Sequence, residues 1–447
     1  MSAASNLSPP IMSSAESILS PIHVLLIHQA FVPPNEPGGT RHYELGRHWV
    51  ESGNQFTIVT SDCNYLTGKS SVSKRGLVEE QNLDGVRVLR AYTYPSLHKS
   101  YFWRIVAFFS FMATSVIASL RAGKIDLVMG TSPSLFQGFS AWVVSVLKRR
   151  PFLLEIRDLW PEFAIDLGVL KNPILIRLSR WLESFLYARA DHLLVNSPAY
   201  RDYLLKKGIP AAKVSVIPNG VDPAMFNPEA RGERTRETWN LGDKFVVTYA
   251  GALGQANDIS TIIGAAERLR DNPRIHFLLA GDGKERPNLE KLALLSKLTN
   301  VTFTGSRPKA EMTDLLAASD ACVATLQNIK LFSTTYPNKV FDYMAAGRAT
   351  ILGIDGVIRD VVEKAHGGVF VTPGDEKALA AAVVDLETHR ERAIEMGRSA
   401  REYVVRHFNR HDQAQNFAEL LERLAGCNES PEATDEESTP KAAAAQS

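Results

Sequence analysis

The chain has 447 residues, more than one hydrophobic core usually supports, so we expect two or more domains. Hydrophobic residues make up 45% of the chain and charged residues 22%, a composition typical of globular proteins with large cores. The formal net charge of +1 argues against a protein that binds nucleic acid.

The cysteines and the two ends carry no sign of a metal site or of secretion. Cys63, Cys322 and Cys427 lie far apart and lack CxxC or Cys/His spacing, which disfavours zinc and favours a reducing compartment. Residues 1–20 are rich in Ser, Ala and Pro without a basic start and an apolar core, so we expect a disordered leader. Residues 425–447, acidic and then Ala-rich, are expected to form a disordered tail.

The first part of the chain has the pattern of a parallel α/β unit. The apolar run 22–27 predicts a strand buried on both faces, and a glycine-bearing loop, a helical pattern and the strand 56–60 follow. Gly38 and Gly39 are expected to bring backbone amides close to an acceptor or a phosphate, although paired glycines also serve turns alone. GxGxxG is absent from this loop, which argues against a dinucleotide-dependent oxidoreductase.

The alternation of strands and helices continues along most of the chain. Further strands are expected at 86–91, 126–130, 152–156, 192–196, 214–217, 245–250, 275–280, 301–304, 321–326 and 349–352. The fold class is therefore α/β, with two Rossmann-like parallel-sheet domains facing a cleft. The predicted parts are an N-terminal domain 21–222, a linker 223–243, a C-terminal domain 244–389 and a helix 390–424 running back to the first domain.

Residues 333–347 predict a helix that begins at Pro337, after a turn of hydroxyl residues, and ends near Gly347. Free amides at such a start, with the positive end of the helix dipole, form an anion site. Lys339 in the first turn is expected to reach the same anion, and Asp342 lies near the same face. This arrangement suits a nucleotide, whose diphosphate would bind the amides and whose ribose would bind the carboxylate. The alternative is an ordinary capped helix that packs apolar side chains into a core.

Residues 101–121 predict an apolar helix. The 16 residues from Ile105 to Leu120 carry no charge and lie between Arg104 and Arg121, short of the roughly 20 residues that a membrane-spanning helix needs. The aromatic residues near its start are typical of helices that lie in a membrane surface. The segment is therefore predicted to contact a membrane surface, or else to be an internal crossover helix.

Several short motifs together resemble one family. The segments 216–222 (VIPNGVD), 280–283 (AGDG), 303–305 (FTG) and 333–347 are similar to motifs of family-4 glycosyltransferases. Residues 155–162 (EIRDLWPE) resemble a bacterial subgroup that includes N-acetylfucosaminyl transferases of surface-polysaccharide assembly. The matches run from about residue 22 to residue 424, in the family's order and spacing.

The resemblance implies the GT-B fold, with the nucleotide sugar held mainly by the second domain and the acceptor by the first. It also implies retaining transfer without a metal. The negative charge of the leaving diphosphate must then be stabilised by amides, a helix dipole and cations. The amides of Thr335 and Asn338, together with Lys339, are the candidates for this role, and Arg307 either assists them or forms a structural salt bridge. The implied donor-binding residues are Gly251, Gly254, Gly281, Asp282, Gly283, Arg307, Thr334, Thr335, Tyr336 and Asn338.

The chain departs from the family pattern at two places. Where the family commonly has two glutamates spaced E-x7-E, Thr334 and Asp342 stand here. The usual Arg and Lys after the first strand of the second domain are replaced by the sequence GALGQAN at 251–257, as tends to be so in the bacterial subgroup. A catalytically weakened, nucleotide-sugar-binding scaffold subunit is therefore an alternative to an enzyme.

The RDLWP segment falls where many family members place a histidine near the reacting sugar. Asp158 is expected to orient the acceptor hydroxyl or to take its proton, with Glu162 in reserve. The alternative for Asp158 is a salt bridge to Arg157 or a helix cap.

The predicted function is retaining transfer of a hexosyl or N-acetylhexosaminyl group from a nucleoside-diphosphate sugar, UDP-linked by expectation, to a hydroxyl of a lipid-linked or glycan acceptor. Asp158, Lys339 and Asp342 are the predicted catalytic residues, with no cofactor and no metal. The protein would act in cell-surface polysaccharide biosynthesis, in the cytoplasm and peripherally on the inner face of the plasma membrane through 101–121. A nucleotide-sugar 2-epimerase on the same fold is a further alternative.

Overall fold

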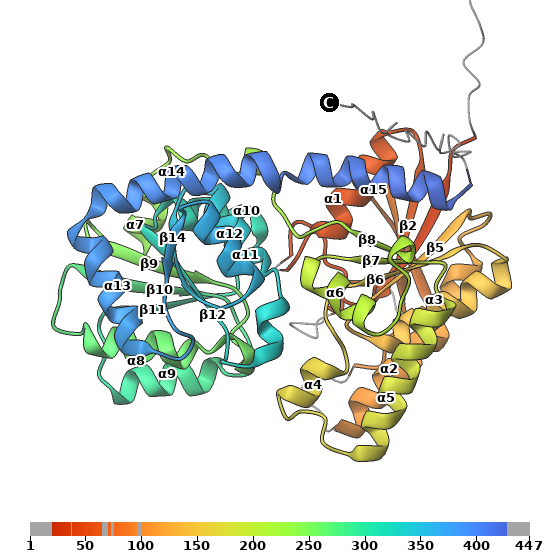
Figure 1. Ribbon diagram of the computed structural model, residues 1–447, viewed down its shortest axis with the longest axis horizontal. Helices are drawn as coiled ribbons and strands as arrows, with labels where there is room; N and C mark the ends of the chain where they lie inside the picture. Colours follow the sequence, from red (N-terminus) through yellow and green to blue (C-terminus); the bar gives the residue numbers. More distant parts are fainter. Residues whose placement is uncertain (1–19, 37, 65–69, 73–75, 96–100, 427–447) are drawn as a thin grey trace, which may run out of the picture.

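A computed structural model describes residues 20–36, 38–64, 70–72, 76–95 and 101–426. These residues form two α/β domains that lie side by side, each with a sheet between layers of helices (Figure 1). Cys427 and nearly all of the expected leader and tail lie outside the described residues.

The first domain has an eight-stranded sheet in the order β3-β4-β2-β1-β5-β6-β7-β8, parallel except for the pair β3–β4. Its strands are β1 His23–Ile27, β2 Gln55–Ser61, β3 Val78–Leu83, β4 Val86–Ala91, β5 Leu127–Thr131, β6 Phe152–Ile156, β7 His192–Val195 and β8 Val214–Val216. Alternate β1 residues pack into two separate cores, Leu25 and Ile27 on one face and Val24 and Leu26 on the other. Because both faces are covered, the strand reads as an unbroken apolar run.

Strand β3 was not predicted from the sequence. It is an edge strand of mostly polar residues, and it pairs with β4 through a two-residue turn at Asp84 and Gly85, both with positive φ. An Asp-Gly pair is the typical sequence of such a hairpin turn, so the signal was present.

The helices of the first domain are α1 Arg41–Glu51, α2 Tyr101–Leu120, α3 Leu135–Lys148, α4 Glu162–Asp166, α5 Pro173–Arg189 and α6 Pro198–Lys206, with 3-10 turns η1 Ala211–Lys213 and η2 Pro223–Met225. Helix α2 is the crossover between β4 and β5. It buries Phe111 and Ala118 in the core but leaves Phe109 and Leu120 about half exposed. Within the described residues, no helix combines the length and apolar character that crossing a bilayer requires.

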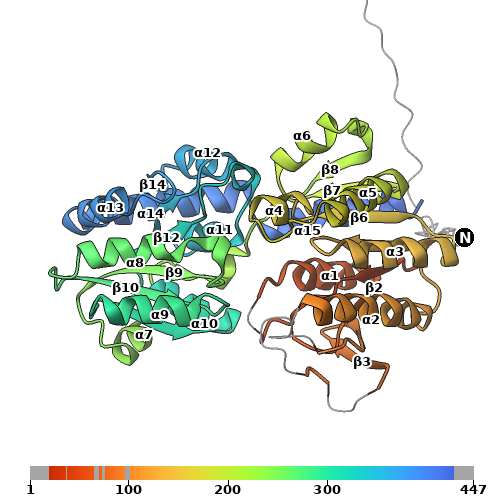
Figure 2. The ribbon, with the colours of Figure 1, turned by 90° about the horizontal axis from the view of Figure 1, so that it is seen from below.

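The second domain has a parallel sheet of six strands in the order β11-β10-β9-β12-β13-β14. The strands are β9 Phe245–Ala250, β10 Ile275–Ala280, β11 Val301–Gly305, β12 Ala321–Thr325, β13 Ala349–Gly353 and the short, unpredicted β14 Gly368–Phe370. The helices are α7 Glu233–Thr238, α8 Ile259–Arg268, α9 Arg286–Leu295, α10 Lys309–Ala317, α11 Asn338–Ala345, α12 Val357–Lys364 and α13 Glu376–Thr388, with 3-10 turns η3 Gln255–Asn257 and η4 Lys330–Thr334. Turn η4 lies against α4 of the first domain (Figure 2).

The predicted return of the chain to the first domain is confirmed, but the prediction of one helix over 390–424 is wrong. Helix α14 (Arg390–His407) packs on the second domain, and α15 (Arg410–Leu424) packs on α1 (Figure 1). At the break, Asn409 caps α15 by accepting from the His411 amide. The Phe408 carbonyl accepts from the Val221 amide at 3.1 Å, and the Arg410 amide donates to the Val221 carbonyl at 2.9 Å. These bonds replace helical ones, so the helix stops where it crosses between the domains.

We predict that Gly220→Ala weakens this crossing. A Cβ atom on Gly220 would overlap the Gln413 side chain and the Phe408 carbonyl oxygen. We expect the free energy of unfolding to fall by about 1–3 kcal/mol, as for other overpacked sites, in a urea titration. The control is Gly76→Ala. Among the described residues its Cβ would have only the Val78 carbonyl oxygen nearby, at 3.9 Å, so stability should change by less than about 0.5 kcal/mol. Equal stability of the two variants would contradict the prediction.

Candidate functional site

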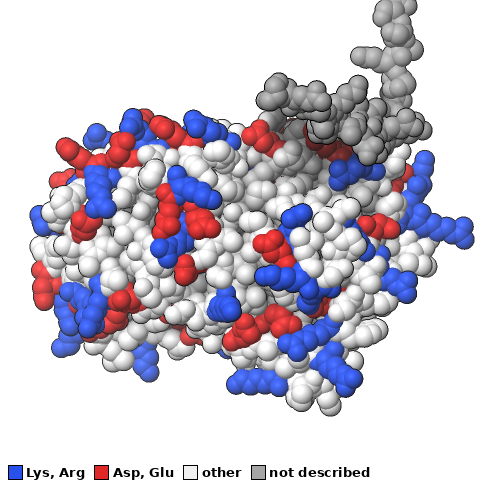
Figure 3. All heavy atoms as spheres, in the orientation of Figure 1, with Lys and Arg blue, Asp and Glu red and all other residues white. Residues whose placement is uncertain are grey.

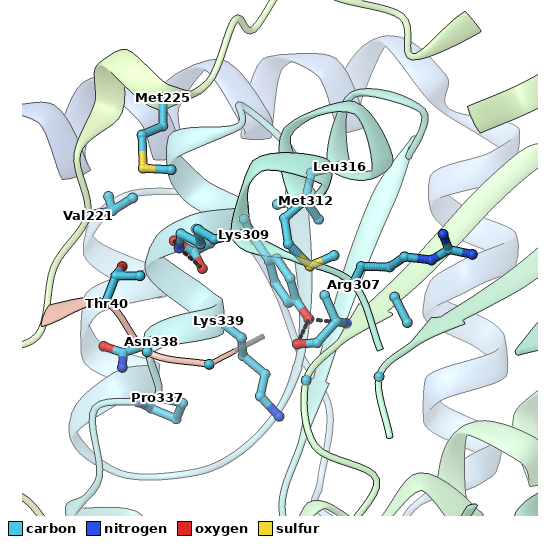
Figure 4. Close-up of a pocket in the computed structure, with 18 of the residues that line it drawn as sticks. Thr40, Val221, Met225, Arg307, Lys309, Met312, Leu316, Pro337, Asn338 and Lys339 are labelled. Carbon is cyan, nitrogen blue, oxygen red and sulfur yellow. Dashed lines mark hydrogen bonds and ion pairs between the residues drawn. The ribbon is translucent and has the colours of Figure 1, made fainter. Parts of the chain in front are cut away.

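A cavity of about 350 Å³ lies between the domains, and we call it the α11 cavity (Figure 4). Gly38 and Gly39 line it from the first domain, and Arg410 lines it from α15. From the second domain, the loops after β9, β10 and β11 and the start of α11 line the cavity. Carboxyl ends of parallel strands thus surround the cavity, which is where such sheets bind ligands.

Glycines bring the loops of the second domain close together. The loop after β9 and the loop after β10 meet at Gly251 and Gly281, where a Cβ on Gly281 would overlap the Gly251 carbonyl oxygen. A Cβ on Gly251 would lie 3.2 Å from the Cε of Lys339, so this glycine also leaves room for the lysine side chain. Gly254 and Gly283 do not line the cavity. Gly283 instead packs against the backbone of Leu253.

Helix α11 begins one residue later than predicted, at Asn338, with Pro337 as the flanking cap residue. The amides of Asn338 and Lys339 occupy the first helical positions, which have no acceptor within a helix. Gly347, with φ of +69°, follows the helix and confirms the predicted end. Because Asn338 and Lys339 both line the cavity, the positive end of the helix faces it.

Thr335 lies in the lining of a second cavity described below, Thr334 does not, and both hydroxyls donate to backbone carbonyls. Their hydroxyls donate to the carbonyls of Leu331 and Phe332 at 2.6 and 2.9 Å, and the Thr335 amide also donates to Phe332 at 3.2 Å. These bonds belong to the tight turn η4, which overlaps the turn of hydroxyl residues predicted before the helix. The Thr335 amide is therefore engaged, and Thr334 lines neither the α11 cavity nor its neighbour described below.

Lys339 is surrounded by neutral groups. Its Nζ donates to the Tyr249 hydroxyl and to Asn257 Oδ1, both at 2.8 Å, and lies 4.3 Å from the centre of the Tyr249 ring. Burial lowers the pKa of Lys339 to about 7. Among the described residues no carboxylate pairs with it, so a bound anion would supply the missing countercharge.

Asp342 is paired with a residue that the sequence analysis missed. Lys309, at the start of α10, donates from Nζ to both Asp342 carboxylate oxygens at 2.7 and 2.8 Å (Figure 4). Arg307 lines the α11 cavity, but it pairs with Glu311 at 3.3 Å and its side chain points away from Asn338 in Figure 4. The second cation near Asp342 is therefore Lys309 rather than Arg307.

Glu44 and Arg410 complete the wall of the α11 cavity, and the sequence analysis missed both. Glu44 accepts from the Thr40 hydroxyl at 2.5 Å and from Arg410 Nε at 2.6 Å. Burial acts to raise the pKa of Glu44, but the Arg410 charge and the Thr40 hydroxyl outweigh it and hold the pKa below its ordinary value. This pair joins α1 to α15 at the edge of the cavity.

A second cavity of about 440 Å³, which we call the Asp158 cavity, adjoins the first. Asp158, from the loop after β6, lines it on one side, and the segment 335–338 lines it on the other. Pro337 and Asn338 line both cavities, so the two spaces meet at the start of α11.

The environment of Asp158 suits a proton acceptor. Burial raises the pKa of Asp158 to about 6, although the charge of Arg157 opposes the shift. The two structural alternatives are not observed: Arg157 donates to His28 Nε2 at 3.1 Å, and Pro161 is the cap residue of α4. Ser132 Oγ accepts from the Asp158 amide at 3.1 Å and fixes the backbone there.

Glu162, the reserve candidate, is engaged elsewhere. Both of its carboxylate oxygens accept from Arg180 of α5, at 2.8 and 2.9 Å, and it does not line the Asp158 cavity. Glu162 therefore links α4 to α5, and Asp158 is left as the carboxylate facing the segment 335–338.

Three amide side chains around the Asp158 cavity have acceptor oxygens without a partner in the described structure. They are the Oδ1 atoms of Asn196, Asn219 and Asn338. Asn196 and Asn219 donate through Nδ2 to the carbonyls of Arg157 and Tyr336, at 3.4 and 2.7 Å, which leaves Oδ1 as the free atom. Buried acceptors are normally hydrogen-bonded, so this cavity is suited to a ligand rich in hydroxyl groups.

A buried ionic cluster holds the first domain's side of the site together. Glu155 accepts from Arg41 Nε at 3.0 Å, from His42 and from the Thr131 hydroxyl at 3.1 Å. Arg41 also donates to the carbonyls of Ile217 and Pro218, both at 2.8 Å. The cluster thereby ties α1 to the strand end that carries Asp158. Among the described residues, no group of three or more His, Cys, Asp or Glu side chains could hold a metal ion.

Comparisons with known proteins agree with this geometry. Residues 38–220 match the family described as "Glycosyl transferase 4-like domain", and residues 244–389 match "Glycosyl transferases group 1". WcaI of Escherichia coli, named as a colanic acid biosynthesis glycosyl transferase, is 26% identical over 288 residues, 62% of this chain and 69% of WcaI. WbjE of Pseudomonas aeruginosa, named as a glycosyltransferase, is 28% identical over 291 residues, 61% of this chain and 68% of WbjE.

Solved structures show the same fold. The crystal structure of Anabaena HepE in complex with UDP-glucose superposes with a TM-score of 0.68 at 18% identity, over 90% of this chain and all of that one. The two family matches together cover most of the chain and both sheets. The chain therefore belongs to the glycosyltransferases of the GT-B fold, with a glycosyl transferase 4-like first domain and a group 1 second domain.

Proposed function

We propose that the protein transfers a sugar from a nucleoside-diphosphate donor to a hydroxyl group of a lipid-linked or glycan acceptor, with retention at the anomeric carbon. One observation carries this proposal. A cationic cavity at the start of α11 joins, at Asn338, a cavity lined by Asp158 and by the amide side chains of Asn196, Asn219 and Asn338. The first suits a diphosphate and the second suits sugar hydroxyls.

The donor would lie in the α11 cavity. Its diphosphate would accept from the Asn338 and Lys339 amides and pair with the Lys339 ammonium. Asp342, held by Lys309, would accept hydroxyl groups of the ribose through its remaining lone pairs. The complex of HepE with UDP-glucose supports a UDP-linked donor, and the resemblance of 155–162 to N-acetylfucosaminyl transferases supports an N-acetylhexosaminyl group.

The reaction follows from this placement. The bond between the anomeric carbon and the diphosphate oxygen breaks, and the acceptor oxygen forms its new bond on the same face of the sugar. The acceptor hydroxyl gives its proton to Asp158, while Lys339 and the α11 amides meet the charge of the departing diphosphate without a metal. Preorganised donors of this kind act where charge develops, so they stabilise the transition state more than the bound substrate.

The cellular role is proposed from the relatives. WcaI is named for colanic acid biosynthesis, which supports a role in cell-surface polysaccharide assembly. The exposed apolar residues of α2 support peripheral attachment to a membrane, which we place on the cytoplasmic face. The alternative function is a scaffold subunit that binds nucleotide sugar without turnover. One observation favours it: the Thr334 hydroxyl, at a position where the family commonly has a glutamate, donates to the backbone within η4.

The first test asks whether Lys339 stabilises the departing diphosphate. A panel of nucleotide sugars is screened by thermal shift, and the one that raises the melting temperature most is used for donor hydrolysis. We expect Lys339→Met to lower kcat roughly 10²–10³-fold, the usual effect of removing one such donor, without loss of folding. The control is Lys364→Met, an exposed lysine of α12. Wild-type turnover in Lys339→Met would remove this residue from the site, and tight binding without turnover in the wild type would support the scaffold.

The second test uses the lowered pKa of Lys339. Above pH 7 the free side chain is mostly neutral, so a diphosphate must draw a proton onto it. UDP-glucose affinity should therefore fall by up to about tenfold per pH unit above pH 7, with proton uptake on binding. Calorimetric titrations in buffers of different ionisation enthalpy measure both quantities. An affinity that stays constant from pH 6 to pH 9, or equal proton uptake by Lys339→Met, would contradict the assignment.

The third test concerns Asp158 as proton acceptor. Because burial raises its pKa to about 6, kcat/KM should decline as the pH falls below about 6 and the carboxylate becomes protonated. Asp158→Asn should lower kcat roughly 10²–10⁴-fold and abolish this acid limb of the pH profile. Asp202→Asn, at an exposed position of α6, serves as the control. An unchanged acid limb in Asp158→Asn would show that another group titrates.

A further inference from the structure

A third cavity, of about 470 Å³, lies within the first domain between α2, α3 and α5, and we call it the α2–α5 cavity. Phe108 of α2, Leu135 and Phe136 of α3, Leu182 of α5 and Trp160 give most of its apolar wall. Uncharged polar residues complete the lining, among them Gln29, Asn64, Thr93, Ser134, Gln137 and Ser179. None of the described residues that line this cavity is charged. The described residues therefore offer no countercharge to a phosphate or a nucleotide there, whereas a hydrocarbon group would be buried from water.

This cavity adjoins the Asp158 cavity. Pro133 and Trp160 line both spaces, just as Pro337 and Asn338 line both the Asp158 cavity and the α11 cavity. The three spaces therefore follow one another, from cationic through hydroxyl-binding to apolar. A molecule whose hydroxyl lies beside Asp158 would have to pass Trp160, which lines both spaces, to place its other end in the third cavity.

The surface next to the cavity is suited to a membrane. On α5, Ile174, Leu178 and Trp181 are 67%, 55% and 61% exposed and follow helical spacing, so they form one apolar stripe beside the cavity residue Leu182. Arg177 lies exposed on the same helix. Over α4 and α5, at the lower right of Figure 3, Lys and Arg side chains lie among uncharged ones, with acidic side chains near α4. Apolar side chains next to cations complement an anionic lipid surface.

We propose that the α2–α5 cavity binds the hydrocarbon chain of a lipid-linked acceptor. The sugar end of this acceptor lies in the Asp158 cavity, and the chain leaves the protein along α5 toward the membrane. The proposal rests on the proposed transferase function for the identity of the ligand, but the binding of hydrocarbon can be measured without turnover. Each methylene group buried in such a space raises affinity roughly fourfold.

The test fills the cavity with a side chain. Ser179 of α5 lines the cavity and is partly exposed, so Ser179→Phe should be tolerated by the fold while occupying the space. The matched control is Ser184→Phe, at an exposed position of the same helix that does not line the cavity. The probe is dansylaminoundecanoic acid, whose fluorescence rises in an apolar site. We expect saturable binding by the wild type and by Ser184→Phe, and at least tenfold weaker binding by Ser179→Phe.

A chain-length series and a second variant sharpen the test. Affinity should rise with each added methylene in dansylated acids of five to eleven carbons, and Phe108→Glu, which places a charge in the cavity wall, should also weaken binding at least tenfold. UDP-glucose binding should remain at the wild-type level in all of these variants, which checks that each is folded. Wild-type probe binding by Ser179→Phe and Phe108→Glu, or an affinity independent of chain length, would overturn the proposal.

Competition distinguishes an acceptor from a membrane lipid as the source of the chain. A short-chain polyprenyl diphosphate sugar should displace the probe, whereas dihexanoyl phosphatidylglycerol should not. Displacement by the phospholipid alone, or by neither compound, would overturn the assignment to an acceptor. If the wild type binds the probe as expected but turns over no nucleotide sugar, the transferase function fails while the hydrocarbon site stands.

Discussion

The site depends on how the segment 334–338 is held between the two domains. The carbonyl of Thr334 accepts from Ser197 Oγ at 2.6 Å, and the carbonyl of Tyr336 accepts from Asn219 Nδ2 at 2.7 Å. Both donors belong to the first domain, so the backbone that leads into α11 is fixed by side chains of the opposite domain. Every residue supplies a backbone carbonyl as acceptor, so the attachment depends on the two side-chain donors, Ser197 and Asn219. It gives α11 its place beside Asp158.

Charge is distributed unevenly around the cavity at the start of α11. Glu44 is paired with Arg410, and Asp342 is paired with Lys309, so these groups compensate one another across elements. Lys339 contacts neutral oxygens and carries a lowered pKa. In the unliganded protein a buried ammonium without a countercharge is costly, and this cost is relieved when an anion binds. In our proposal, the selectivity of this end of the site for a diphosphate follows from this incomplete ion pair.

The three adjoining cavities divide the recognition of two substrates among different kinds of physical interaction. We propose that electrostatic attraction acts at Lys339, hydrogen bonding to hydroxyl groups near Asp158, and burial of apolar surface beyond Trp160. In our proposal the reacting centre lies in the middle space, where a charged donor and an apolar acceptor meet. The Glu155 cluster supports this arrangement, because it ties α1, with the glycine loop before it, to the strand end that carries Asp158.

The strand pattern and the helix start at Asn338 could be read from the sequence because they depend on local order. Apolar runs predict strands covered on both faces, and Pro337 followed by a helical pattern predicts a free helix start. The edge strand β3 and the break at Asn409 were missed, since a polar edge has no apolar pattern and the break depends on pairing with Val221.

By itself, then, the sequence determined the α/β class, the two domains and the residue types near the α11 cavity. Only the tertiary structure decided which charges are paired, as Lys309 with Asp342, and which hydroxyls are turned away, as Thr334 is in η4. The physical reason is that partners come from elements far apart in the chain. Long-range packing, which local propensity does not specify, brings those elements together.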